Sequence, residues 1–257
     1  MDFVWVKSVG ASSSIHNLTG ANAKLLLSGT LTDDKLFSGG SAGVHVYAFG
    51  GDENSGARIA ALDNMALRVG GGPLWPKDAN GNFTPLNQYQ PSPLFGPTNT
   101  SITPWPATKV DGIAYPTGDS GFSGGGALAY ALLQTNGVAN TEYIGYLGIN
   151  DATTVGTTNW LTFNSQPTTT LNAFGVAYAV RNNIYSFWGY EHFLYREGNF
   201  PVNQRLLGMA LTVATNIQNQ LYNLDASVSG ITISAMSCHR NSDGGLVLSG
   251  ETPPNGP

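Results

Sequence analysis

The sequence predicts a mixed α/β fold. Short β-type runs alternate with helix-like segments through the first part of the chain, an order that favours an α/β lobe over an all-β sandwich. Glycine-rich turns stand where an extended pattern stops and a helical pattern starts. The chain has 257 residues and a hydrophobic content of 41%, which suffices for one large domain or two lobes.

The N-terminal elements follow from their apolar periodicity. Residues 3–7 are an extended run, and residues 21–27, which come soon after Ile15-His16-Asn17-Leu18-Thr19, form a short amphipathic stretch. Residues 44–49 alternate as a strand, and residues 59–68 have the spacing of a helix.

The central elements include a long connection. Residues 73–108 hold many of the prolines and several aromatic residues, and a loop of this length is usually functional or an insertion packed by its own aromatics. A helix is expected over residues 127–134.

The C-terminal pattern is different. We expect an aromatic helix over residues 184–195, a second helix over residues 203–221 and a strand over residues 231–236. A polar tail rich in glycine and proline closes the chain.

The first glycine-rich turn that leads into a helix is a candidate anion site. The strand ending at Phe49 runs into Gly50-Gly51, and a helix-like segment follows Asn54-Ser55-Gly56-Ala57. Backbone N–H groups at a helix start, the helix dipole and the Ser55 hydroxyl together suit a small anion. The alternative is an ordinary N-cap, in which Asn54 or Ser55 caps the helix and nothing binds.

A second glycine-rich turn spans residues 118–126, before the helix at residues 127–134. If the two turns face one cleft, Ser123 joins Ser55 around a ligand. Turn chemistry without a ligand is the alternative for this stretch.

Several motifs share an order that resembles a known family. Asn17-Leu18-Thr19 precedes a helix, Ser55-Gly56 and Arg58 stand at a helix start, and Ile144-Gly145-Tyr146 lies in a strand. This order over roughly residues 3–220 is similar to that of phosphate-type substrate-binding proteins of ABC importers, in the type II periplasmic-binding-protein superfamily. The family pattern at the helix start is R-x-x-x-S-G-T-R, and the resemblance also implies a strand over residues 142–147.

The resemblance implies a two-lobed architecture. Residues 8–176 would form one intact α/β lobe, the second lobe of the family. Residues 177–257 would form the hinge return and the C-terminal portion of the first lobe, whose N-terminal part the sequence lacks. Residues 3–7 and 176–182 would be the hinge that closes the lobes on a ligand.

The resemblance also implies a function without catalysis or cofactors. The chain would be a periplasmic or extracellular binding protein, with a small anion such as phosphate as its ligand and an ABC permease as its partner. The ligand-binding residues carried over, with the second glycine-rich turn added, are Asn54, Ser55, Gly56, Ala57, Arg58 and Ser123.

Two departures from the family pattern leave the ligand open. Gly51 replaces the arginine that pairs with phosphate, and Ala57 replaces the threonine. Losing that arginine removes a two-bond, charge-assisted contact, so a neutral or weakly held ligand, or none, remains open. The alternative function is a structural or adhesive surface or assembly protein that no longer binds phosphate. An incomplete first lobe would expose apolar surface and favour self-association.

Composition disfavours other classes of function. Charged residues make up only 11% of the chain, the net charge is −5, and the Lys and Arg residues form no basic stripe, so nucleic acid is not an expected partner. The sequence shows neither a leader pattern nor a run of about 18 apolar residues. A single cysteine, Cys238, forbids an internal disulfide.

Apparent catalytic and metal motifs are weak. Gly118-Asp119-Ser120-Gly121 matches the nucleophile motif of trypsin-like proteases, but no histidine has the sequence context which that fold requires. The His, Cys and carboxylate residues lack the spacing of metal ligands. We therefore expect neither serine catalysis nor a metal site.

Overall fold

The computed structural model describes most of the N-terminal two thirds of the chain and short pieces beyond it. The described residues are 2–10, 15–29, 33–38, 43–65, 86–93, 96, 99–110, 112–134, 138–166, 185–189, 208–209, 211–213, 215–216, 238–240 and 247–249.

A three-stranded mixed sheet lies at the centre, in the order β1-β8-β3. The middle strand, β8 (Thr141–Gly148), pairs antiparallel with β1 (Phe3–Lys7) and parallel with β3 (His45–Phe49). The apolar composition of β8 follows from its place, because neighbouring strands and helices cover both of its edges and faces.

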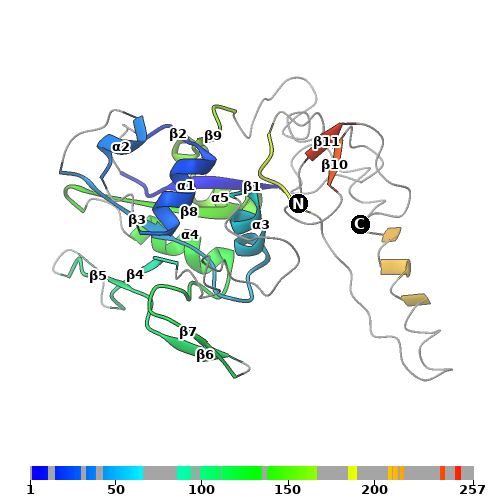
Figure 1. Cartoon of the computed structure of the whole chain (residues 1–257), viewed down its shortest axis with the longest axis horizontal. Helices are drawn as coiled ribbons and strands as arrows, with labels where there is room; N and C mark the ends of the chain where they lie inside the picture. Colours follow the sequence, from blue (N-terminus) through cyan, green and yellow to red (C-terminus); the bar gives the residue numbers. More distant parts are fainter. Residues whose placement is uncertain are drawn as a thin grey trace, which may run out of the picture.

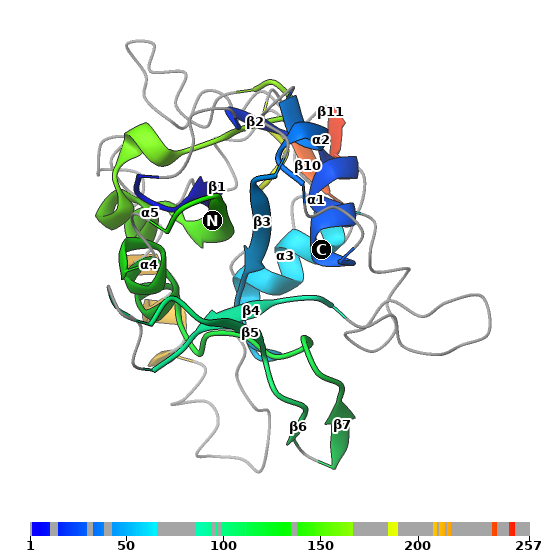
Figure 2. The ribbon, with the colours of Figure 1, turned by 90° about the vertical axis from the view of Figure 1, so that its left-hand side faces the viewer.

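Helices cover both faces of this sheet, as Figure 2 shows. α1 (Gly20–Leu27) and α3 (Gly56–Asn64) lie on one face, and α4 (Gly125–Gln134) and α5 (Ile149–Val155) lie on the other. Alternate residues of the strands therefore enter two separate cores. The first core includes Trp5, Leu26, Leu62, Ile144 and Tyr146. The second includes Val4, Val6, Leu128, Tyr143 and Leu147.

The smaller elements surround this layered unit (Figure 1). They are α2 (Lys35–Ser38), the 3₁₀ turn η1 (Thr157–Asn159), and the strand pairs β2 (Asn17–Leu18) with β9 (Thr162–Phe163), β4 (Tyr89–Pro91) with β5 (Ile102–Pro104), β6 (Thr108–Val110) with β7 (Ile113–Tyr115), and β10 (Cys238–Arg240) with β11 (Val247–Ser249). The β6–β7 hairpin extends away from the sheet.

The structure confirms the mixed α/β fold and the elements around the central strands. The strands predicted at residues 3–7, 44–49 and 142–147 are β1, β3 and β8. The helices α3 and α4 begin at Gly56 and Gly125, three and two residues before their predicted starts.

Two predicted elements are wrong over the residues that the structure describes. Residues 185–189 are not helical: Trp188 forms a β-bridge with Asp2, and the Phe3 amide donates to Phe187 O at 3.1 Å. These aromatic side chains pack onto β1, and that tertiary contact overrides their local helical spacing. The stretch predicted as one long loop contains the β4–β5 pair in its second half.

Several predictions lie wholly or partly outside the described residues. Residues 176–182, 190–195 and 231–236 are not described, whereas residues 208–209, 211–213 and 215–216 are helical within the predicted 203–221 helix. The division into lobes at residues 8–176 and 177–257 stays a prediction. Among the described residues, no helix is long and apolar enough to span a membrane.

Candidate functional site at two helix N-termini

The chain itself caps the N-terminus of α3. The Arg58 amide donates to Ser55 Oγ at 3.3 Å, so Ser55 is the N-cap residue. The Ser55 amide donates to Asp52 O at 3.1 Å, and the Asn54 amide donates to Asp52 Oδ1 at 3.0 Å. Ser55 therefore caps the helix, and these amides already have acceptors within the turn. Whether a ligand also binds there stays a prediction.

The turn before α4 lies directly beside the turn before α3. Gly51 forms a parallel β-bridge with Phe122. The Phe122 amide donates to Gly50 O, and the Asp52 amide donates to Phe122 O, each at 2.9 Å. The structure thus brings together the two glycine-rich turns, which are about seventy residues apart in the sequence.

Glycine is required for this close approach. A Cβ on Gly121 would collide with the carbonyl oxygens of Gly50 and Gly51, which are backbone atoms that cannot easily move. A Cβ on Gly51 would collide with the Ser55 side chain. Side chains at these positions would push the two turns apart.

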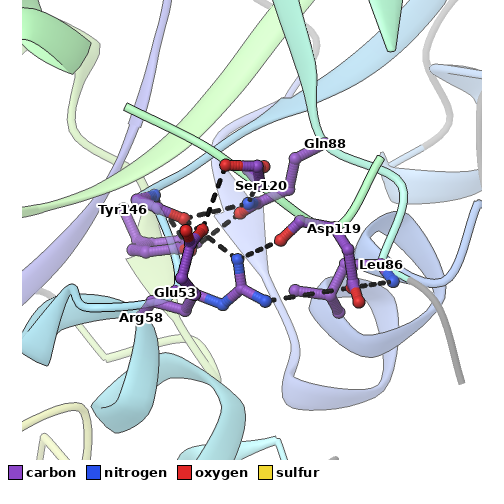
Figure 3. A network of polar contacts seen from close by, with 8 residues as sticks. Glu53, Arg58, Leu86, Gln88, Asp119, Ser120 and Tyr146 are labelled. Atoms are coloured by element: carbon purple, nitrogen blue, oxygen red, sulfur yellow. Dashed lines mark hydrogen bonds and ion pairs between the residues drawn. The ribbon is translucent and has the colours of Figure 1, made fainter. Parts of the chain in front are cut away.

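A buried ion pair joins Arg58 to Asp119, as Figure 3 shows. The Arg58 and Asp119 side chains are only 2% and 1% exposed, and Arg58 Nη2 lies 3.8 Å from Asp119 Oδ1. Arg58 Nη1 donates to Gly51 O at 3.3 Å and to the Asp119 carbonyl oxygen. Asp119 Oδ1 also accepts a hydrogen bond from the Leu86 amide at 2.8 Å.

Gln88 and Tyr146 extend the same network to β8. Gln88 Nε2 donates to Gly51 O at 3.0 Å and to Ser120 O at 2.9 Å. The Tyr146 hydroxyl donates to Gln88 Oε1 at 2.8 Å and accepts from the Gly51 amide at 3.1 Å. The network therefore fixes the Gly51 turn to the segment before α4 (Figure 3).

Burial shifts the titration of the network. It lowers the pKa of Arg58, which Tyr146 and Asp119 partly oppose. Burial also raises the pKa of Asp119, although the Leu86 hydrogen bond and the Arg58 charge act in the opposite direction. The pKa of Tyr146 rises to about 12 because its hydroxyl is buried, so this group stays protonated and can donate.

The Ser120 hydroxyl is not arranged as a nucleophile. It donates to Glu53 Oε2 at 3.1 Å, and both residues are buried. No histidine among the residues that the structure describes bonds to it, so a base of the kind that serine proteases use is missing there. The described residues also include no group of three or more His, Cys, Asp or Glu side chains that could hold a metal ion.

Carboxylates occupy the positive ends of both helices. Asp52 and Glu53 precede α3 within its turn. An Asp151 carboxylate oxygen, from the first turn of α5, reaches the place where a Cβ on Gly125 would stand, at the start of α4. These charges interact favourably with the helix dipoles and would repel an external anion.

The structure separates the predicted site residues into two groups. Asn54, Gly56 and Ser123 are exposed, and Ser55 is half-buried. Arg58 faces the interior, and Ala57 packs against the first core. The two glycine-rich turns are adjacent, and whether these residues bind a ligand stays a prediction.

Sequence reasoning missed the partners of Arg58. Asp119 stands out in the sequence only as part of the protease-like motif, and Gln88 lies within the predicted long loop. One signal could have found them: Arg58 is flanked by apolar residues in a chain with only 11 Lys and Arg residues. An arginine inside an apolar helix needs a buried acceptor.

Comparisons with known proteins give one distant structural likeness. No protein-family model matches the sequence, and no curated protein matches it. Among solved structures, the chain is similar to a crystal structure of PstS from Borrelia burgdorferi. The TM-score is 0.43 and the sequence identity 15%, over 87% of this chain and 69% of that chain.

Proposed function

We propose that the chain is a non-enzymatic ligand-binding protein whose ligand lies over the paired N-termini of α3 and α4. The observation that carries this proposal is the Gly51–Phe122 bridge, because it brings together the turns that lead into α3 and α4. The amides of Gly56 and Ala57 are the first of α3 and have no acceptor within the helix. With the exposed Asn54 and Ser123 side chains, they supply donors at one surface.

The proposed ligand is small, polar and without net charge. Gly51 stands where the resembled family has its phosphate-pairing arginine, and Arg58 is already paired with Asp119. Asp52, Glu53 and Asp151 add negative charge around the two helix N-termini. A doubly charged oxyanion would meet repulsion here without a compensating guanidinium.

The setting of this function is proposed from the motif order alone. It is a periplasmic or extracellular protein with a type II binding-protein scaffold, which delivers its ligand to an ABC permease. The hinge through residues 3–7 and 176–182 belongs to the same proposal.

Calorimetric titration with inorganic phosphate, sulfate, glycine and glucose tests the proposed ligand class. We expect saturable heat with glycine or glucose and none with phosphate or sulfate. Replacing both Asn54 and Ser123 by Ala should weaken that binding at least about tenfold, which corresponds to about 1.4 kcal/mol. Tight phosphate binding would contradict the proposal, because the site would then have kept the anion specificity of the family.

A second candidate function is structural or adhesive assembly on the same scaffold. The internal caps at Ser55 and Asp52 favour it, because they leave fewer groups for a ligand. So do the exposed apolar side chains of Tyr130 on α4 and of Met209 and Leu211, which are 61%, 65% and 58% exposed. Light scattering after size exclusion separates the two functions: concentration-dependent oligomers without heat in the titrations would favour assembly.

A further inference from the structure

The Asp119 carboxylate lies against both the Arg58 guanidinium and the Leu86 amide. Its Oδ1 atom faces Arg58 Nη2 at 3.8 Å and accepts from the Leu86 amide at 2.8 Å. A guanidinium and a backbone N–H converging on one carboxylate oxygen are the donors that proteins use for external carboxylates and oxyanions.

We propose that Arg58 and the Leu86 amide form a carboxylate-binding site which Asp119 occupies from within, so that Asp119 excludes external anions from it. The inference concerns the interior of the network and does not depend on the ligand proposed for the surface. It makes Asp119 the residue that determines whether this protein binds anions at Arg58.

The site would survive the loss of its internal occupant, because other contacts hold the donors. Arg58 Nη1 donates to Gly51 O, and Gly51 is held in turn by Gln88 and Tyr146. A Cβ on Gly118 would collide with Leu86 O, so the Leu86 segment is packed directly against the turn before Asp119. Truncating Asp119 therefore leaves a space bounded by fixed donors.

Size and charge determine which anion fits that space. Asp119→Ala removes one carboxylate group, so the cavity matches formate more closely than phosphate or sulfate. The Arg58 side chain is only 2% exposed, and a buried guanidinium without its partner is strongly unfavourable. One negative charge replaces the charge of the lost carboxylate, whereas a second charge would be repelled by Glu53, which is buried and already acts electrostatically on Asp119.

Thermal unfolding of Asp119→Ala in sodium formate, compared with sodium chloride at equal ionic strength, tests the proposal. We expect its Tm to lie below that of the wild-type protein in chloride and to rise by about 3–6 °C, saturably, with formate. Wild-type protein and Asp119→Asn should respond equally to both salts, because a full-sized side chain fills the space. Asp119→Ala combined with Arg58→Met should also lose the formate response.

Equal responses of Asp119→Ala to formate and chloride would overturn the proposal. If Asp119→Ala does not fold in chloride, its refolding yield in formate and the thermal response of Asp119→Ser provide the measurement. Equal yields and equal shifts in both salts would again overturn it. The wild-type titrations with phosphate and glucose test the surface site separately, so failure of one proposal is distinguishable from failure of the other.

Discussion

The Tyr146 hydroxyl donates to Gln88 Oε1 at 2.8 Å while it accepts from the Gly51 amide at 3.1 Å. The central strand of the sheet is therefore bonded, through one phenol, both to the turn before α3 and to the segment that holds Gln88. Tyr146 and Gln88 are 1% and 0% exposed, so water cannot replace either bond.

We expect Tyr146→Phe to destabilise the protein by about 2–4 kcal/mol, because it leaves the Gly51 amide and Gln88 Oε1 buried without this partner. Urea unfolding measures the change. The matched control is Tyr130→Phe, since Tyr130 is 61% exposed, and its effect should stay within about 0.5 kcal/mol. Equal effects of the two substitutions would show that the network contributes nothing to stability.

Two glycine-to-alanine substitutions should have opposite effects. Gly121→Ala places a Cβ against the carbonyl oxygens of Gly50 and Gly51 and should cost about 2–4 kcal/mol. Gly126→Ala meets nothing closer than Asp151 Oδ1 at 3.9 Å and lies in α4, so better helix propensity should add up to about 1 kcal/mol. Comparable stability of the two variants in thermal unfolding would mean that the two glycine-rich turns can separate freely.

The strands and the helices could be predicted where a local pattern determines them. Residues 3–6 and 143–147 are apolar runs, and their burial in the sheet follows from that composition. The predicted starts of α3 and α4 are a few residues late because Gly56 and Gly125 have low helix propensity. Gly56 and Gly125 are the first residues of their helices, where the low helix propensity of glycine costs little and capping determines where the helix starts.

The C-terminal aromatic segment shows why local spacing was insufficient. The Tyr185 hydroxyl donates to Phe3 O at 2.7 Å, and Phe187 stacks on Trp5. The first of these contacts joins residues 182 positions apart. These contacts pair the Tyr185 hydroxyl and bury the Phe187 ring, both of which a helix would leave exposed. A short stretch of sequence cannot show them, because their partners lie near the N-terminus of the chain.

The candidate site could be predicted only in part for the same reason. The adjacency of the two glycine-rich turns follows from chain order in an α/β layer. The inward orientation of the Arg58 side chain does not follow from chain order, because its partner Asp119 is 61 residues away. The resemblance placed Arg58 among the ligand-binding residues, which stays a prediction, and it gave no sign that the guanidinium is buried and faces Asp119.

A double-mutant cycle measures how strongly Arg58 and Asp119 interact. Each of Arg58→Met and Asp119→Asn should cost about 3–5 kcal/mol, because each leaves a buried polar partner uncompensated. The double variant should lose less than the sum of the two, with a coupling of about 1–3 kcal/mol. The exposed Lys109→Met is the control, and additive losses in urea unfolding would contradict a direct interaction.

Stability should decrease as the pH rises from about 5 to about 8, because of Glu142. Burial raises the pKa of Glu142 from 4.5 to about 7, and Asp34 adds to the shift while Lys7 opposes it. The folded protein therefore holds a proton that the unfolded chain releases above pH 4.5, and this stabilisation disappears as the pH passes 7. The side chain is fully buried, and neither of its oxygens has a hydrogen-bond partner among the described residues.

Glu142→Gln should reduce this pH dependence, because the amide does not titrate. We expect the difference in unfolding free energy between wild type and variant to change by on the order of 1–2 kcal/mol between about pH 5 and pH 8. Asp2, whose pKa burial raises to about 6, contributes in the same direction in both proteins and cancels in that difference. Parallel stability curves over this range would show that Glu142 is already ionised at the acidic end, and that Lys7 compensates its charge within the fold.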